Sequence, residues 1–290
     1  MSDAALNPAR YILTVSCPDK VGIVAAVAGV LADSDLFITD SHHFGDPGTR
    51  NFFMRTAFEA ANPEFNRTAF ASRFAPIAER FAMRWSLHDC ALRPSALIMV
   101  SKSDHCLNDL LYRHRTGSLP VHIPAIVSNH MNLAPLAEWH KIPFLYVPVT
   151  KNNKPEAEAR LRDIIAETKA DFIVLARYMQ ILSQELCAEL EGRAINIHHS
   201  FLPSFKGAQP YRQAHQRGVK LIGATAHFVT PDLDEGPIIE QMVERIDHSY
   251  TAEAMAAAGR DVESQVLARA VRWLAEQRVF LNGNKTVVFR

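Results

Sequence analysis

Several signatures of common protein classes are missing from this sequence of 290 residues. No two of its 12 glycines are separated by a single residue, so the GxGxxG fingerprint of dinucleotide-binding folds cannot occur. Only Gly218 and Gly223 have the spacing of a phosphate-binding P-loop, and Ala224 stands where that motif requires lysine. There is no HExxH motif, and the adjacent pairs His42-His43 and His198-His199 project differently in any regular element. We therefore expect no Rossmann dinucleotide site, no Walker-type NTPase and no metal site.

An excess of charge of either sign is also missing. Lys plus Arg and Asp plus Glu both number 31, which gives a formal net charge of zero and no electrostatic footprint for nucleic acid or an anionic membrane. The longest apolar run, Val21 to Ala32, is too short to span a bilayer, and the N-terminal residues lack the apolar region of a secretory signal. The four cysteines form no CxxC pair. These features favour a cytoplasmic protein with reduced thiols.

The length favours two domains at about 150 residues each, and the first ninety residues have the pattern of a small α/β domain. Hydrophobic alternation and turn residues predict strands, and helical spacing predicts helices between them. The predicted strands are 11–17, 37–44, 52–59 and 83–88, and the predicted helices are 21–32 and 65–81. This β-α-β-β-α-β order is the ferredoxin-like split βαβ pattern.

Residues 17–23, Cys-Pro-Asp-Lys-Val-Gly-Ile, stand at the first strand-to-helix turn of this unit, and they resemble the corresponding turn of ACT domains. The resemblance implies a regulatory module that binds an amino-acid effector near Asp19 and Gly22 and that pairs with another copy in a homo-oligomer. The alternative is a ferredoxin-like domain without a ligand, in which Gly22 only allows a tight turn. We expect this domain to span 1–88, with a linker over 89–95 and a second domain over 96–290.

Short apolar runs alternate with helical stretches in the second domain. The predicted strands are 96–100, 123–127, 144–149, 172–175, 194–197, 221–229 and 238–246. The predicted helices are 106–114, 133–140, 155–168, 183–190 and 252–276, and Gly259 is a candidate position for an interruption of the last. Continuous apolar strands separated by helices indicate a Rossmann-like, mostly parallel sheet that is covered on both faces. Ligands of such sheets bind beyond the carboxyl ends of the strands.

Polar side chains follow two of these strands. Asn196 and His198 are two residues apart, so on an extended chain they point to the same face. An amide donor and an imidazole could together bind a developing oxyanion, and a carboxylate such as Asp234 could orient the imidazole or activate water. This pattern suits attack on a carbonyl group. The alternative from the residues alone is that Asn196 and His198 only satisfy backbone groups at a strand end.

A family resemblance favours the catalytic interpretation. The segments that carry it are 196–198, 200–207, 227–229 and 234–239, and in order and spacing they resemble the 10-formyltetrahydrofolate-dependent formyltransferases, with glycinamide ribonucleotide formyltransferase as the best-known member. The resemblance covers most of residues 95–250 and implies that Asn196, His198 and Asp234 are the catalytic amide, imidazole and carboxylate. Residues 175–183 are similar to the family's folate-pocket segment. The folate contacts that this implies are Met179, Gln180, Ile181, Leu182, Val229 and Asp232.

Two departures from the nucleotide-binding relatives identify a branch of the family. The place of their glycine-rich phosphate loop is taken by residues 101–107, which contain no glycine, and Asp104 would repel a phosphate. His199 stands where the transferases carry a different residue. These departures, with segments 208–211 and 278–280, resemble the formyltetrahydrofolate deformylase branch, in which an ACT domain precedes the catalytic domain. Four side chains are candidates for filling the acceptor site and ordering a water there: Lys102, Asp104, His105 and His199.

The resemblance therefore implies hydrolysis of 10-formyltetrahydrofolate to tetrahydrofolate and formate, which would supply purine biosynthesis and balance one-carbon pools. Water would replace the amine acceptor, the folate would be the substrate, and no cofactor would be needed. One alternative is a formyltransferase that acts on an amine. Another is a non-catalytic sensor of folate or amino acids, which retention of Asn196, His198 and Asp234 disfavours.

Overall fold

The computed structural model describes residues 8–60, 65–203 and 210–290. The motif residues Ser204 to Gly207 and Ala208-Gln209 lie outside this part of the chain. The chain forms two compact units: unit 1 comprises 1–93, 277–282 and 287–290, and unit 2 comprises 94–276 and 283–286. Unit 1 ends its first segment inside the expected linker. The expected second domain over 96–290 differs from this division, because most of the last fourteen residues group with unit 1.

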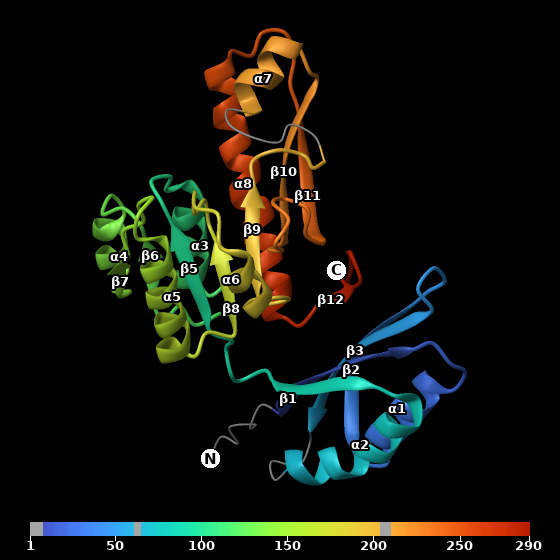
Figure 1. The fold of residues 1–290 in the computed structure, drawn as a ribbon. Helices are drawn as coiled ribbons and strands as arrows, with labels where there is room; N and C mark the ends of the chain where they lie inside the picture. The colour runs from blue at the N-terminus through green and yellow to red at the C-terminus, as the bar shows by residue number, and fades with distance from the viewer. Residues whose placement is uncertain (1–7, 61–64, 204–209) are drawn as a thin grey trace, which may run out of the picture. The chain divides into compact units, whose positions relative to one another are not determined.

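Unit 1 has the β-α-β-β-α-β order that its sequence predicts. The elements are β1 (Ala9–Pro18), α1 (Ile23–Ala32), β2 (Leu36–Asp46), β3 (Asn51–Ala60), α2 (Arg67–Phe81) and β4 (Arg84–Asp89). The strands form an antiparallel sheet in the order β2-β3-β1-β4 (Figure 1). The ferredoxin-like fold is confirmed.

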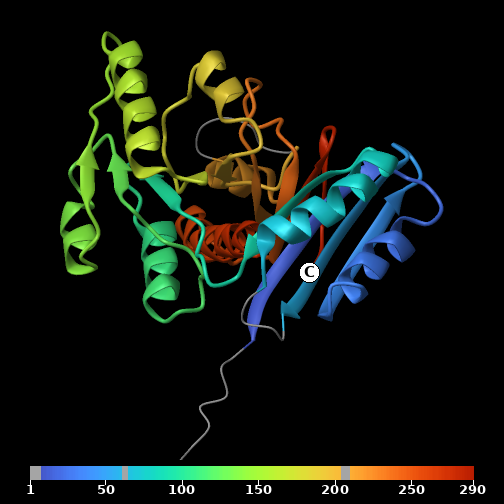
Figure 2. The same cartoon turned by 90° about the horizontal axis from the view of Figure 1, so that it is seen from below.

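Both helices of unit 1 pack on one face of its sheet, as Figure 2 shows. Alternate residues of β1, such as Leu13 and Val15, meet Val27 of α1 and Phe74 of α2 in one buried cluster. The side chain of Asn66 caps α2 by accepting a hydrogen bond from the Ala69 amide at 3.0 Å.

Two C-terminal strands, β12 (Val279–Asn282) and β13 (Lys285–Val288), were not predicted. Phe280 contacts Phe53 of β3 edge to face, with ring centroids 5.8 Å apart, and it also contacts Phe289. Asn282 accepts a hydrogen bond from the Asn51 side chain and donates one to Asp46. The C-terminal residues thus complete the packing of unit 1 around Phe53, which is buried.

Unit 2 is built on a seven-stranded sheet in the order β11-β10-β9-β8-β5-β6-β7. Its strands are β5 (Ala96–Val100), β6 (Ile126–Ser128), β7 (Phe144–Tyr146), β8 (Phe172–Leu175), β9 (Ala194–His198), β10 (Leu221–Phe228) and β11 (Ile238–Arg245). Its helices are α3 (His105–Arg115), α4 (Ala134–Trp139), α5 (Lys154–Thr168), α6 (Gln184–Glu189), α7 (Pro210–Arg217) and α8 (Ala252–Ala275). The strands from β7 to β9 are parallel, and β10 and β11 are antiparallel to their neighbours. The mostly parallel, Rossmann-like sheet is confirmed.

Helices cover both faces of this sheet. Leu161 of α5 and Leu186 of α6 share a buried cluster with Leu97 and Ile173 of the central strands. The long helix α8 runs beside β9 and β10 and packs against α3 (Figure 1). No helix among the described residues has the length and apolar character needed to cross a membrane.

The expected interruption of α8 near Gly259 is wrong, because the helix is continuous from Ala252 to Ala275. Gly259 has a packing role instead. A Cβ atom at this position would lie 2.1 Å from the ring and the hydroxyl of Tyr211. Only glycine lets the Tyr211 side chain lie directly on the helix backbone.

Candidate active site

A pocket of about 610 Å³ lies in unit 2 where β8 and β9 end and where the loop after β10 begins. This is the carboxyl-terminal edge of the parallel strands, where the sequence analysis expects a ligand. The lining residues are Leu175, Arg177, Tyr178, Met179, Gln180, Ile181, Leu182, Cys187, Asn196, Ile197, His198, His199, Tyr211, His227, Val229, Thr230, Pro231, Leu233 and Asp234.

Asn196, His198 and Asp234 come together in this pocket as expected. His198 is buried, and its Nδ1 lies 3.2 Å from Oδ2 of Asp234. A carboxylate can only accept, so the imidazole donates from Nδ1. Its Nε2 is buried and has no hydrogen-bond partner among the described residues. His198 lines the pocket, so this nitrogen is the ring atom left to pair with a bound substrate.

His227 connects the amide of Asn196 to this pair. The antiparallel register of β9 and β10 places His227 directly opposite Asn196. His227 Nδ1 lies 2.8 Å from the carbonyl oxygen of Phe228, so it donates there, and Nε2 can accept from Asn196 Nδ2 at 3.3 Å. One N–H of the amide is held by this bond, and the other is left for a ligand.

Asp234 lies on a loop that closes tightly after β10. The Phe228 amide donates to the Pro237 carbonyl oxygen at 2.9 Å and joins the two ends of the loop. A Cβ atom on Gly236 would lie 1.7 Å from the Phe228 carbonyl oxygen, so only glycine permits this close approach. Asp234 itself has a left-handed backbone with φ 59°. Such conformations are rare for residues other than glycine, and aspartate is among those that adopt them most readily.

The environment of Asp234 favours its ionised form. Burial raises the pKa of this carboxyl group, but the hydrogen bond from His198, together with the nearby His227 ring, outweighs burial and holds the pKa below its usual value. The second imidazole lies 3.7 Å from Oδ1 of Asp234. Asp234 is thus a carboxylate whose negative charge faces the His198 ring.

Apolar side chains form the opening of the pocket. Met179 and Ile181 are 57% and 63% exposed although they are large and apolar, and Leu233 across the pocket is 58% exposed. The Met179 amide donates to Oγ of Ser101 at 3.0 Å, and Ser101 donates to the Asn129 side chain. All the folate contacts implied by the resemblance line the pocket except Asp232, which is exposed.

A polar wall formed by Arg177, His199 and Tyr211 borders the same pocket. Burial and the nearby Arg177 charge lower the pKa of His199 to about 4, so this imidazole is neutral at pH 7. Of the acceptor-site candidates, His199 belongs to this wall and His105 lies behind it. Lys102 and Asp104 are exposed and do not line the pocket.

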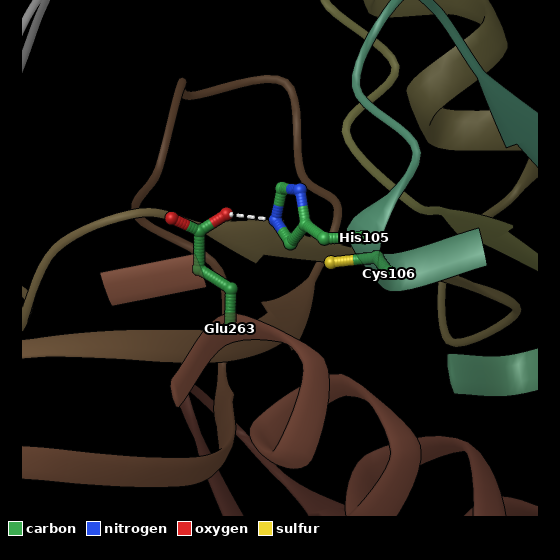
Figure 3. Close-up of side chains that lie close together, drawn as sticks. All are labelled: His105, Cys106 and Glu263. Atoms are coloured by element: carbon green, nitrogen blue, oxygen red, sulfur yellow. Dashed lines mark hydrogen bonds and ion pairs between the residues drawn. The ribbon is translucent and has the colours of Figure 1, made fainter. Parts of the chain in front are cut away.

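Behind the polar wall lies Glu263 of α8, which is 1% exposed. Its Oε1 accepts from the Tyr211 hydroxyl at 2.7 Å, and its Oε2 lies 2.8 Å from His105 Nε2 and 3.4 Å from Arg177 Nε. Burial raises the pKa of Glu263, but hydrogen bonds and the Arg177 charge outweigh it and lower the pKa. Figure 3 shows His105 at the start of α3 pointing across to Glu263.

His105, Cys106 and Glu263 could also be considered as metal ligands, because their donor atoms lie within 4.8 Å of one another (Figure 3). Burial and the nearby Glu263 charge raise the pKa of the Cys106 thiol, whereas a metal-bound thiol is deprotonated. Both oxygens of Glu263 already accept hydrogen bonds, and Arg177 lies beside one of them. The donor set therefore favours a hydrogen-bonded network over a cation site.

The effector candidates lie in unit 1. Gly22 precedes α1 with φ 95°, a left-handed conformation that favours glycine. The Asp19 amide donates to the Arg50 carbonyl oxygen at 2.8 Å, and the residue is exposed. Binding of an amino acid at Asp19 and Gly22 stays a prediction.

Sequence reasoning missed four residues of this site. His227, Arg177 and Tyr211 stand inside segments that carried the family resemblance, but no role was assigned to them. For Glu263 the sequence contains one indication of a special role. It is a charged residue in the apolar stripe of α8 that includes Val262 and Val266.

Comparisons with known proteins agree with the fold. The family model described as formyl transferase matches residues 95–271. The chain is 48% identical to a formyltetrahydrofolate deformylase of Corynebacterium sp. (strain P-1), over 97% of this chain and 98% of that protein. The crystal structure of a formyltetrahydrofolate deformylase from Burkholderia mallei is 55% identical, with a TM-score of 0.94, over 98% of this chain and 100% of that one. A phosphoribosylglycinamide formyltransferase from Anaplasma phagocytophilum is 28% identical, with a TM-score of 0.63, over 69% of this chain and 96% of its own.

Proposed function

Because this chain belongs to the formyltetrahydrofolate deformylase family, we propose that its reaction takes place between Asn196, His198 and Asp234. The chain hydrolyses 10-formyltetrahydrofolate to tetrahydrofolate and formate. Transfer of the formyl group to an amine is not favoured, since the deformylases match nearly its whole length at higher identity than the transferase.

The proposal assigns the formyl oxygen to Asn196 and His198. The second N–H of the Asn196 amide and the unpartnered Nε2 of His198 both belong to the pocket. Two such donors stabilise the negative charge that develops on the oxygen when the formyl carbon is attacked. His198 donates from Nε2 as an imidazolium, and the Asp234 carboxylate lies 3.2 Å from the other ring nitrogen of His198.

Water is the proposed nucleophile. Its oxygen bonds to the formyl carbon while one of its protons moves toward Asp234. The bond from carbon to N10 then breaks, N10 takes up a proton, and the products are tetrahydrofolate and formic acid, which ionises to formate. The lowered pKa of Asp234 makes it a weak base, so the proton passes on to N10 rather than staying on the carboxylate.

The remaining assignments are also proposals. The apolar opening formed by Met179, Ile181, Leu182 and Val229, with Gln180, receives the pterin ring. The carboxylate, amide and imidazole supply the acid–base and electrostatic chemistry, so the mechanism assigns no step to a cofactor. We place the reaction in the cytoplasm, where the four free thiols stay reduced, and assign its formate to purine synthesis and one-carbon balance. An amino acid at the ACT-like unit and a homo-oligomer are the proposed means of regulation.

The observation that carries the mechanism is the ion pair of His198 and Asp234 beside Asn196 in one pocket. The test is to supply 10-formyltetrahydrofolate alone in ¹⁸O-labelled water. We expect formate with one solvent oxygen, formed at the same rate as tetrahydrofolate. Formate release that requires an added amine would contradict the proposal.

A further inference from the structure

Two residues that line the pocket, Arg177 and His198, carry buried polar atoms without a hydrogen-bond partner. Among the described residues, five buried side-chain atoms lack a hydrogen-bond partner: Ser95 Oγ, His105 Nδ1, Arg177 Nε, Arg177 Nη1 and His198 Nε2. Two belong to Arg177 in the polar wall, and a third belongs to the catalytic imidazole. Arg177 Nε has only its ion pair with Glu263 at 3.4 Å, and Nη1 has no hydrogen bond among the described residues. A buried donor without a hydrogen bond is costly, so Nη1 indicates where a small polar molecule binds.

Arg177 is held in this place by groups that have no role in the chemistry itself. Its guanidinium faces Glu263, whose carboxylate is fixed by the Tyr211 hydroxyl and by His105. Gly259 stands one helical turn before Glu263, and it lets Tyr211 lie against α8. The left-handed backbone of Arg177, with φ 65°, is unusual for a residue with a long side chain. The protein thus maintains a strained backbone and a buried ion pair to keep this guanidinium at the pocket.

The N–H donors of the polar wall favour water over an amine as the molecule that receives the formyl group. A water molecule has two lone pairs, so one can attack the formyl carbon while the other accepts from Arg177. The nitrogen of an amine has one lone pair, and once this is directed at the carbon, the amine offers only N–H donors to the wall. Arginine carries donors and no acceptor, so an attacking amine would leave Arg177 Nη1 without a hydrogen bond.

We propose that Arg177, positioned by Glu263, selects water over amines as the formyl acceptor by donating to the second lone pair of the attacking oxygen. Arg177 is then a specificity-determining residue, and Glu263 is a positioning residue. This inference rests on the proposed reaction at Asn196, His198 and Asp234, and it adds a reason why the formyl group reaches water.

The experiment measures how much of the formyl group goes to water and how much goes to an added amine. The enzyme is given 10-formyltetrahydrofolate with a labelled formyl group and excess glycinamide, and the ratio of formylglycinamide to formate is determined. The main variant is Arg177→Gly, because glycine adopts positive φ without cost and the backbone is retained. Glu263→Gln removes the counter-charge. Gly259→Ala displaces Tyr211 while placing a good helix former in α8.

We expect each variant to form less formate and to raise the ratio of formylglycinamide to formate, by about tenfold for Arg177→Gly, as for the loss of one hydrogen bond to a charged group. Lys169→Gly is the control for removing a cationic side chain at positive φ, here 49°. Glu240→Gln is the control for neutralising a buried acid that pairs with α8, here through Arg269. Both controls should keep the wild-type ratio.

A lower rate with an unchanged ratio in Arg177→Gly and Gly259→Ala would mean that the cluster only supports the fold, and would overturn the inference. If the proposed mechanism at Asn196, His198 and Asp234 is wrong, the result is different, because Asp234→Asn would then leave formate release intact. Wild-type enzyme that formylates glycinamide as fast as it releases formate would overturn both proposals.

Discussion

Replacing Asp234 by asparagine tests the proposed chemistry most directly. The carboxylate lies 3.2 Å from His198 Nδ1 and is 11% exposed, so solvent screens this pair weakly. Asparagine removes the negative charge that faces the His198 ring and removes the base that takes the proton of water. Loss of a general base costs about 10²–10⁴ in rate, or about 2.7–5.4 kcal/mol of transition-state stabilisation at 1.36 kcal/mol per tenfold.

The assay compares kcat and KM for formate release by Asp234→Asn with those of Asp232→Asn, which neutralises an exposed acid of the same loop that does not line the pocket. KM should change little in either variant, because the apolar opening around Met179 and Ile181 is unaltered. An Asp234→Asn enzyme that keeps more than about a tenth of wild-type kcat would remove Asp234 from the mechanism.

The pH dependence sharpens this test. The pKa of Asp234 lies below its usual value, so the carboxylate is ionised at every pH from 5 to 8. A spectroscopic titration of the Asp234 carboxyl group should therefore detect no protonation in this window. A carboxyl group that takes up a proton between pH 8 and pH 5 would contradict its observed environment.

Asn196→Ala should lower kcat by about 10²–10³ with an unchanged melting temperature, as for one lost oxyanion donor; a well-folded variant of normal kcat would refute this role. In the folded chain the pKa of His199 is about 4, below the ordinary 6.5. As the pH drops from 6.5 towards 4, the unfolded chain takes up a proton at this residue that the folded chain does not, so the free energy of unfolding falls. His199→Asn should lose less melting temperature on acidification than wild type; equal losses would contradict this. Deleting residues 1–88 should leave some hydrolysis but abolish any response to amino acids; an equal response in both forms would contradict the regulatory assignment. Because the deletion exposes Phe280 and Phe289, a chain of residues 94–276 should stay more soluble than one of residues 89–290 in a sedimentation assay.

The sequence was sufficient for the fold class because each long element has a local signal. The runs 96–100 and 172–175 are uniformly apolar and form buried parallel strands, and turn residues separate β2 from β3. The end of the chain gave a weaker signal, since β12 and β13 have four residues each and are set by packing against Phe53. Gly259 misled the helix prediction, because a glycine needed for packing resembles one that ends a helix.

The site was predictable as far as its residues lie on neighbouring strands and loops. Asn196 and His198 share one strand face, and the family motifs pointed to Asp234. The network around Glu263 was beyond local patterns, because His105 and Glu263 are 158 residues apart and meet only through the packing of α3 on α8. Likewise, the pairing of His227 with Asn196 follows from the antiparallel register of β9 and β10.

The return of the C-terminal residues to unit 1 has a consequence for synthesis on the ribosome. Residues 8–89 emerge first, but 227 residues separate Phe53 from its partner Phe280. At about 5–20 residues per second, the sheet around Phe53 lacks that cover for roughly 11–45 s while unit 2 is made. The nascent chain therefore carries an apolar surface through most of its translation. This surface is where a chaperone would bind, and where two chains growing on one messenger RNA would first associate.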